Sequence, residues 1–551
     1  MDTDRPTTAL LEKEDTVYGV VDYRGRPLSR RKAGGWRSAF LIMVGETAER
    51  FAYYGIASNL INYLTGTFGQ SVAEAAISVD IWSGCVTVFP LLGALLGDSF
   101  FGRYPMVVAA SFVYFLGTAM LTLSAILPSL HPSQCQEQEV ENCSPPTRFQ
   151  TMFLFTSLYM VAIAQGGHKP CVQAFGADQF DARHPMESRS KSSFFNWLNF
   201  ALCFGSASSV IIVPVIQDNK SWGLGFSLPC ISIAIALALF LLGTPTYRFT
   251  KNETGVDVLI RQGPVISGDE RLPLQISSEE APPLRKSDWS VLITEAKELS
   301  QLIPIWGSCI FHGVVVAQTS SLFTKQGGTM DSRVLGPRFQ EFQLPAAALQ
   351  STTSLVLLLL VPLYDRAFVP AARFFTKLPS GITMLQRIGV GLIFSVASMA
   401  TAAAVESRRL ALVRELGIAD EAGATVPMSI WWLLPQYLLY GAASLFAYIG
   451  SLEFFYDQMP DRLKSVGIAF CLTIYGVGSF VSGILVSAVD KASSARGRSW
   501  LDSNLNRAHL DYFYALIAAL SSVGFGLFLS FAKSYVYRNK PDGEGPIELV
   551  S

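Results

Sequence analysis

The sequence contains little charge for its length, and this scarcity excludes several classes of protein. Only 15% of its 551 residues are Asp, Glu, Lys or Arg, whereas 50% are hydrophobic and 12% are aromatic. The formal net charge is -1 and no basic stripe with interleaved aromatic residues occurs, so we expect no nucleic-acid surface. Such a composition is typical of a chain whose main solvent is a lipid bilayer, and it predicts one membrane domain.

Motifs for metal binding and covalent chemistry are also missing. The five histidines are scattered without HExxH spacing, the cysteines form no CxxC pair, and the phosphate-binding pattern GxxxxGK(S/T) is absent. No nucleophile lies beside a base in a recognisable pattern. We therefore expect a protein that is not an enzyme and that has no metal site and no cofactor.

A cleavable signal peptide is not recognisable, because residues 1–37 are polar and the first apolar run is long enough to span a membrane. Basic residues crowd the approach to that run, which predicts a cytosolic N-terminal tail. They are Arg24, Arg26, Arg30, Arg31, Lys32 and Arg37.

Twelve apolar runs remain, each of about 20 residues and therefore long enough for a transmembrane helix. Six precede and six follow a charged, proline-rich break, and they lie at 38–64, 77–97, 105–127, 149–168, 194–216, 224–244, 302–322, 345–364, 384–404, 429–452, 466–489 and 511–533. The sequence thus predicts an all-α polytopic membrane protein with 12 transmembrane helices in two six-helix halves, which resembles the major-facilitator fold. The predicted parts are a cytosolic tail (1–37), two bundles (38–246 and 301–535), a cytosolic linker (247–300) and a cytosolic C-terminal tail (536–551).

The charges of the loops agree with this topology at one place and fit less well at another. The loop 128–147 should lie outside, and it contains three glutamates but no Lys or Arg. The loop after the ninth span should also lie outside, yet it contains Arg408, Arg409 and Arg414 among four acids. We count this second loop as weak evidence against the topology.

The turn between the second and third spans, Gly97 to Arg103, is rich in glycine and contains Asp98. An Asp and an Arg at such a turn can join neighbouring helix ends in one conformational state, so Asp98 and Arg103 are candidates for conformational gating. A weak counterpart lies between the eighth and ninth spans, at 364–368 and Arg373. A purely structural turn is an equally good interpretation.

Three ionisable residues lie inside the first span, where a buried charge costs about 3 kcal/mol or more. Glu46, Glu49 and Arg50 are spaced i, i+3 and i+4, so they share one helical face that cannot be solvated by lipid. Two carboxylates beside a guanidinium form a competent proton site, because protonation of one Glu releases the Arg to pair elsewhere. A static ion-pair clamp is the alternative.

Lys169 is a further charge out of place, at the predicted end of the fourth span. It could contact an anionic substrate or a carboxylate of the first span, or it could extend to the cytosolic interface as a snorkelling side chain. His312 in the seventh span is a lone histidine on an apolar face, and we expect it to be a packing residue.

The run Glu46-Thr47-Ala48-Glu49-Arg50-Phe51-Ala52-Tyr53-Tyr54-Gly55 resembles the ExxERFxYYG motif of proton-dependent oligopeptide transporters. Further matches extend nearly end to end, and together they resemble the plant nitrate/peptide transporter family. They include 175–181 (FGADQFD), 194–199 (FFNWLN), 453–456 (EFFY) and 500–506 (WLDSNLN).

This resemblance implies proton-coupled symport by alternating access, with Glu46, Glu49 and Arg50 as coupling residues and Lys169 as the fourth-helix lysine of the family. Tyr53, Tyr54 and Asn199 match positions that line the family's central cavity and bind substrate. The sequence departs from the family pattern at two positions. Ser444 replaces a carboxylate common in the tenth span, and Val316 replaces the histidine of a nitrate-transporting member.

We therefore expect a symporter for a small anionic solute, such as nitrate, a short peptide or an organic-acid hormone, with the lipid bilayer, protons and this solute as its partners. A membrane sensor with little flux is the alternative. We expect residence in the plasma membrane or the vacuolar membrane, and Leu10-Leu11-Glu12 is either a vacuolar sorting signal or an apolar pair in a tail. Cys135 and Cys143 share one outer loop, where a disulfide is possible, and Asn142 begins a glycan acceptor pattern.

Overall fold

The computed structural model describes residues 16–30, 33–97, 101–132, 145–181, 184–250, 286–333, 344–376, 382–421, 423–459 and 464–537. The loop with Cys135, Asn142 and Cys143 lies outside these residues, as do Leu10 and Leu11. The described chain is mostly helical, which confirms the predicted fold class.

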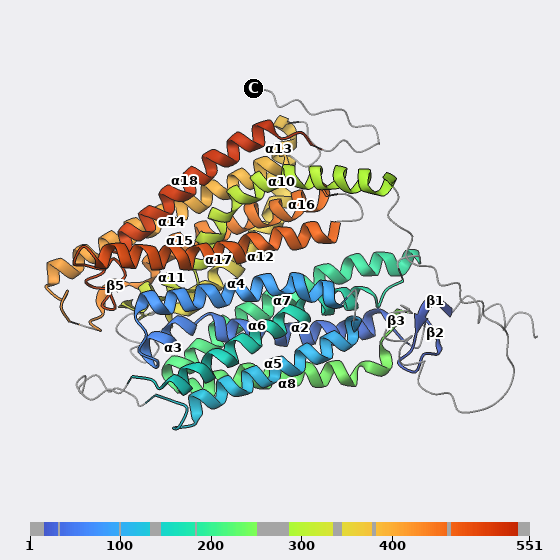
Figure 1. Ribbon diagram of the computed structural model, residues 1–551, viewed down its shortest axis with the longest axis horizontal. Coiled ribbons are helices and arrows are strands. Elements are labelled where there is room, and N and C mark those ends of the chain that lie inside the picture. The colour runs from blue at the N-terminus through green and yellow to red at the C-terminus, as the bar shows by residue number, and fades with distance from the viewer. Residues whose placement is uncertain are drawn as a thin grey trace, which may run out of the picture.

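The N-terminal half consists of six transmembrane segments, of which the first is divided into two helices (Figure 1). Capping boxes fix the starts of two of them, since Ser71 and Glu74 bond each other's backbone N–H groups, as do Thr147 and Gln150. The segments are α2 (Gly35–Ala57) with α3 (Leu60–Gly66), α4 (Val72–Leu96), α5 (Arg103–Ile126), α6 (Arg148–Ala177), α7 (Pro185–Asn219) and α8 (Trp222–Leu242).

The C-terminal half repeats this plan, and its first segment is divided at the corresponding place. Two other segments contain a π-helical turn, η5 (Tyr364–Phe368) and η7 (Ser444–Tyr448). The segments are α10 (Lys286–Gln318) with α11 (Leu322–Gly327), η4 (Ala346–Gln350) with α12 (Ser351–Leu363) and α13 (Val369–Thr376), α14 (Met384–Leu416), η6 (Ile430–Leu433) with α15 (Leu434–Ala443) and α16 (Ile449–Asp457), α17 (Lys464–Ser494) and α18 (Leu510–Ser534).

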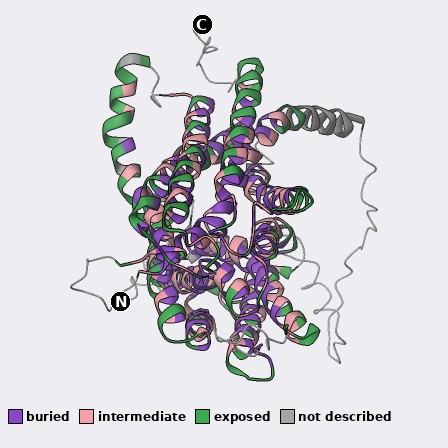
Figure 2. Ribbon diagram, turned by 90° about the vertical axis from the view of Figure 1, so that its left-hand side faces the viewer, coloured by how far each residue is buried: buried purple, intermediate pink, exposed green. Residues whose placement is uncertain are grey.

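Ten helices in the described part of the chain are long and apolar enough to cross a membrane. The two remaining segments, α2 and α6, are also long enough, and they contain the polar residues of the candidate site. Large apolar side chains are exposed along the outside of both halves, where Figure 2 shows exposed positions in green. Lipid is the environment that accommodates such a surface; examples are Leu92, Phe112, Ile163, Phe204, Leu359 and Ile484.

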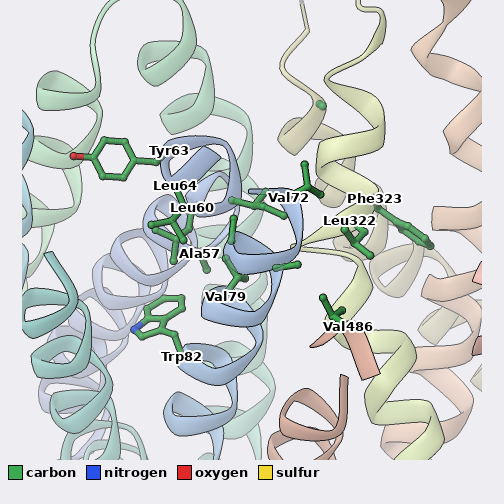
Figure 3. Close-up of a cluster of buried hydrophobic side chains, with 14 of the residues drawn as sticks. Ala57, Leu60, Tyr63, Leu64, Val72, Val79, Trp82, Leu322, Phe323 and Val486 are labelled. Carbon is green, nitrogen blue, oxygen red and sulfur yellow. The ribbon is translucent and has the colours of Figure 1, made fainter. Parts of the chain in front are cut away.

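The two halves meet at the end of the molecule that contains α3 and α11 (Figures 1 and 3). Small residues let α4 and α17 approach closely, because a Cβ on Gly84 would lie 2.5 Å from the ring of Phe480. Val72 and Val79 of α4 share one buried cluster with Leu322 of α11 and with Val486 of α17 (Figure 3). Apolar packing therefore holds this contact together.

Hydrogen bonds across this end join the divided first segment to α11 and to η4 of the other half. The break between α2 and α3 lies at Ser58 and Asn59, and the break between α10 and α11 lies at 319–321. The Lys325 ammonium donates to Thr65 Oγ1 at 2.8 Å, and the Gln350 amide donates to the carbonyl oxygen of Ser58 at 2.9 Å. Each half thus contacts the other near its own helix break.

A small sheet at the opposite end joins the N-terminal tail to the start of the linker. Its strand order is β2 (Pro27–Ser29), β1 (Thr16–Val21), β3 (Phe249–Thr250), with antiparallel pairs. The buried Arg248 supports it, because this side chain donates to Glu187 Oε2 at 2.7 Å and to the carbonyl oxygen of Ala33 at 2.9 Å. The tail and the start of the linker therefore lie at one end, which agrees with an even number of spans.

One of the three arginines of the loop after the ninth span, Arg409, belongs to a buried ion pair. Helix α14 continues to Leu416, beyond the predicted span, and Arg409 lies 2.6 Å from Glu406 with both side chains fully buried. Arg409 also donates to Asn506 and to the carbonyl oxygen of Leu505, both at 2.7 Å. Because Glu406 neutralises this charge, Arg409 is weak evidence about the side of the membrane on which this loop lies.

Candidate functional site

Helix α2 turns its charged face into the N-terminal half. The exposed fraction is 1% for Glu46, 0% for Glu49 and 8% for Arg50. Close packing of α7 closes this face, because a Cβ on Gly205 would lie 3.1 Å from Arg50 Cβ. The i, i+3, i+4 spacing of Glu46, Glu49 and Arg50 therefore predicted a buried helical face correctly. Lipid does not contact these charges.

Glu49 is held by an ion pair and by hydrogen bonds. Arg50 Nε lies 3.4 Å from Glu49 Oε2. On its other oxygen, Glu49 accepts hydrogen bonds from the Gln165 amide and, at 3.4 Å, from the Tyr114 hydroxyl. The Gln165 amide also donates to the Tyr114 hydroxyl at 3.0 Å. One carboxyl oxygen of Glu49 thus accepts hydrogen bonds and the other forms the ion pair.

Glu46 has a different environment, although it lies one turn away on the same face. Neither of its carboxyl oxygens makes a hydrogen bond of ordinary geometry, although the Gln173 side chain lies close by. The nearest basic atom is His168 Nδ1, at 3.5 Å from Glu46 Oε1, and His168 is itself buried. A buried carboxyl group without hydrogen bonds is more stable neutral than charged. Glu46 is therefore the carboxyl group in this cluster that is suited to hold a proton.

Lys169 belongs to the same cluster. It is half-buried on α6 and lies within electrostatic reach of Glu46, Glu49 and Arg50. Helix α6 continues for eight residues beyond it, to Ala177, so Lys169 lies about 12 Å from the helix end. The predicted fourth span, 149–168, therefore ended too early. The position of Lys169 within the helix favours a contact inside the protein over snorkelling to the membrane surface.

The other predicted binding residues differ in their placement. Tyr53 stacks on Trp82 with ring centroids 5.8 Å apart, and the ring of Tyr54 lies edge-on to it at 5.1 Å. Both tyrosines are half-buried next to the charged face. Asn199 is exposed on α7, six residues from Gly205 and therefore about 9 Å along the helix. Its role in binding stays a prediction.

The C-terminal half presents hydroxyl groups toward this cluster. Tyr448 of η7 lies within electrostatic reach of Arg50 and Tyr54, and Tyr440 of α15 lies within reach of Tyr54. The hydroxyl of Ser444 is close to that of Tyr440 on its own segment. No acid occurs between Leu434 and Tyr448, so this segment supplies no carboxylate to the cluster.

The predicted gating pair is described only in part. Asp98 lies outside the described residues, whereas Arg103 Nη1 lies 2.6 Å from Asp178 Oδ2 at the end of α6. Arg103 thus joins the start of α5 to the end of α6. A gating role for Asp98 and Arg103 stays a prediction.

Three residues of the site were missed by reasoning from charge alone. Gln165, Tyr114 and His168 are neutral or weakly basic, and they form the surroundings of the two glutamates. Polar residues within apolar runs were the available signal. Within the described ranges, no group of three His, Cys, Asp or Glu side chains could hold a metal ion.

The two helical halves, the lipid-facing surface and the charged cluster inside the first segment define a multi-pass membrane transporter of the major-facilitator type. A family model described as "PTR2: POT family" matches residues 104–266 and 269–501. The chain therefore belongs to the POT family, whose members are transporters and not enzymes. This finding confirms the family resemblance that the motifs of the first segment indicated.

Relatives and solved structures agree with this assignment. The chain is 48% identical to Protein NRT1/PTR FAMILY 5.10 of Arabidopsis thaliana, over 94% of this chain and 96% of that protein. It is 46% identical to Protein NRT1/PTR FAMILY 5.15 of the same plant, over 96% and 98% of the two chains. An auto-inhibited POT family peptide transporter shares its fold, with a TM-score of 0.68, 21% identity and coverage of 92% and 99%.

Proposed function

We propose that this transporter is a symporter that couples the inward movement of protons to that of a small anionic solute. The observation that carries the proposal is the unequal environment of the two buried glutamates. Glu49 is paired with Arg50 and accepts hydrogen bonds from Gln165 and Tyr114, whereas neither oxygen of Glu46 makes a hydrogen bond of ordinary geometry. One carboxyl group is thus held ionised while the other is free to exchange a proton.

The charges of the cluster explain how a proton and an anion would be coupled. With Glu46 and Glu49 ionised, their two negative charges balance the positive charges of Arg50 and Lys169. Protonation of Glu46 leaves the cluster with a net charge of +1. A buried site with an uncompensated positive charge is stabilised by an anion, so proton binding favours solute binding.

The C-terminal half would complete the binding site with hydroxyl groups. Tyr440, Tyr448 and Ser444 can donate hydrogen bonds to an anion and contribute no competing negative charge. Release of the proton from Glu46 would then restore the internal charge balance and release the anion. No cofactor takes part in this scheme, and the proton gradient is the only source of energy.

Nitrate, a short peptide and an organic-acid hormone are the solute classes that we propose, at the plasma membrane or the vacuolar membrane of a plant cell. The test uses purified protein in liposomes with an acidic exterior. Uptake of a solute from each class is compared with and without the pH gradient. Accumulation above equilibrium with the gradient supports symport, whereas binding without flux would support the sensor.

A further inference from the structure

The chain that leads into α2 carries a basic surface that the proposed coupling cluster does not use. Residues 23–45 contain six basic residues and no acid. Three of these residues, Arg24, Arg26 and Arg37, are exposed, and we call them the basic face. Arg37 precedes Glu46 by nine residues of helix, or about 14 Å, so the basic face is separate from the coupling cluster.

Arg30, in the same stretch, is already neutralised and does not belong to the basic face. Its Nη2 lies 2.9 Å from Asp181 Oδ2, and its Nε lies 3.5 Å from Glu187 Oε1. Arg248 Nη1 lies 2.7 Å from Glu187 Oε2. Two cations and two acids therefore balance each other in this cluster, which joins the tail to the ends of α6 and α7.

Arg37 lies on a face of α2 that its neighbours leave open at the start of the helix. Three turns further along, the same face is covered by α8, because Ser232 donates to the carbonyl oxygen of Ala48 at 2.8 Å. Near the start of α2 this cover ends, since both Arg37 and Phe40 are exposed, Phe40 by 61%. Phe40 lies one turn deeper than Arg37 and suits contact with acyl chains.

The surroundings of Arg37 place it at the level of the lipid headgroups. Trp36, the preceding residue, is exposed by 39%, and tryptophan is enriched where the hydrocarbon meets the headgroups. The end of α8 lies beside this position, because Ser38 donates to the carbonyl oxygen of Thr246 at 2.6 Å. Leu242 at that end is exposed by 75%, so an apolar surface continues next to Arg37.

The turn between β1 and β2 holds the other two arginines at the same end of the molecule. Asp22 Oδ1 accepts hydrogen bonds at 2.8 Å from the backbone N–H groups of Arg24 and Arg26, which fixes the turn while both side chains stay exposed. The strand before the turn pairs with Phe249, whose ring lies 5.1 Å from that of Tyr104 in the first turn of α5. The turn is therefore anchored to the cytosolic ends of the helices.

We propose that the basic face binds the headgroups of anionic phospholipids in the cytosolic leaflet. Three arginines and one nearby acid, Asp22, leave a net charge of +2, which is complementary to such headgroups. Arginine also forms paired hydrogen bonds with phosphate oxygens. A free anion has no acyl chains, whereas a lipid can contact the exposed side chains of Phe40 and Leu242 as well. This binding does not depend on the proposed symport.

The test uses the purified full-length protein in a neutral detergent and phosphatidylserine with a dansyl group on one acyl chain. Energy transfer from the tryptophans, Trp36 among them, reports binding of this lipid. We expect tighter binding than for phosphatidylcholine with the same label, and we expect salt to reduce the difference. Millimolar inorganic phosphate at constant ionic strength should not displace the lipid. Displacement by phosphate would contradict a site for a lipid.

Arg37→Gln should weaken the binding of phosphatidylserine about fivefold, with no effect on phosphatidylcholine. Arg37→Lys keeps the charge and should retain most of the affinity. Removal of the turn arginines by Arg24→Gln and Arg26→Gln should weaken binding further. Arg366→Gln is the matched control, since it removes an exposed arginine from η5 in the other half, and it should bind like the parent protein.

Three results would overturn the proposal. They are equal affinity of the parent protein for the two lipids, unchanged affinity in Arg37→Gln, and an equal loss in Arg366→Gln. Each of them leaves the proposed symport untouched, because the coupling cluster is intact in all of these variants.

Discussion

Replacing Glu49 by glutamine removes the partner of Arg50 while changing the size of the side chain very little. At the observed separation of 3.4 Å, the pair interacts with about 5 kcal/mol for an effective dielectric constant of about 20. Arg50 would be left buried without this interaction, which is strongly unfavourable. Glu46 lies one turn away on the same face and is the carboxylate available to replace it.

Pairing with Arg50 would keep Glu46 ionised and so block its protonation. An interaction of about 5 kcal/mol corresponds to more than a thousandfold loss in proton binding. Glu49→Gln should therefore abolish accumulation driven by a pH gradient. Exchange of labelled for unlabelled solute should stay measurable, because exchange does not require the proton to leave.

The assay uses liposomes that contain the parent protein, Glu49→Gln or Glu46→Gln, and it measures both accumulation and exchange. Glu46→Gln serves as the matched comparison, since it fixes the neutral form and leaves the Glu49–Arg50 pair intact. Its solute binding should no longer depend on pH. Undiminished accumulation in Glu49→Gln would show that the transported proton binds elsewhere.

Three further predictions concern charge and topology. Titration calorimetry should show that Lys169→Ala and Ser444→Glu each weaken anion binding about tenfold. The loss of affinity in the double variant should be much smaller than the product of the two single losses. Burial opposes ionisation of Glu187, but hydrogen bonds and the charge of Arg248 outweigh it and lower its pKa. Glu187→Gln should thus lower the stability by about 3 kcal/mol at neutral pH, and the difference should vanish as the pH falls through that lowered pKa in thermal unfolding scans. Tags at both termini and in the linker 247–300 should be accessible only from the cytosol; an outer linker tag would contradict the two-half topology.

The number and order of the spans could be predicted because a long apolar run has few alternatives to a membrane helix. The breaks within the first and seventh segments could not, because they occur inside apolar runs and depend on contacts between the halves. The sequence around Ser58 and Ser321 gives little indication that the helix is interrupted there. The outer end of α14 was also missed, since hydropathy treats Arg409 as exposed although Glu406 neutralises it.

The candidate site was predicted in part for a similar reason. Charges inside an apolar run identified Glu46, Glu49 and Arg50. Gln165 and Tyr114 are uncharged, so their role became visible only when the fold placed α5 and α6 against α2. Both residues are far from α2 in the sequence, so the sequence alone does not reveal that they contact Glu49.

Proton-coupled symport is tested most directly by a simultaneous measurement of proton and anion movement in liposomes that contain the purified protein. A pH indicator inside the liposomes follows protons while labelled solute follows transport. Protons should enter together with the anion, and the anion should accumulate when the exterior is acidic. Anion uptake without proton entry, at a rate unaffected by the pH gradient, would contradict it.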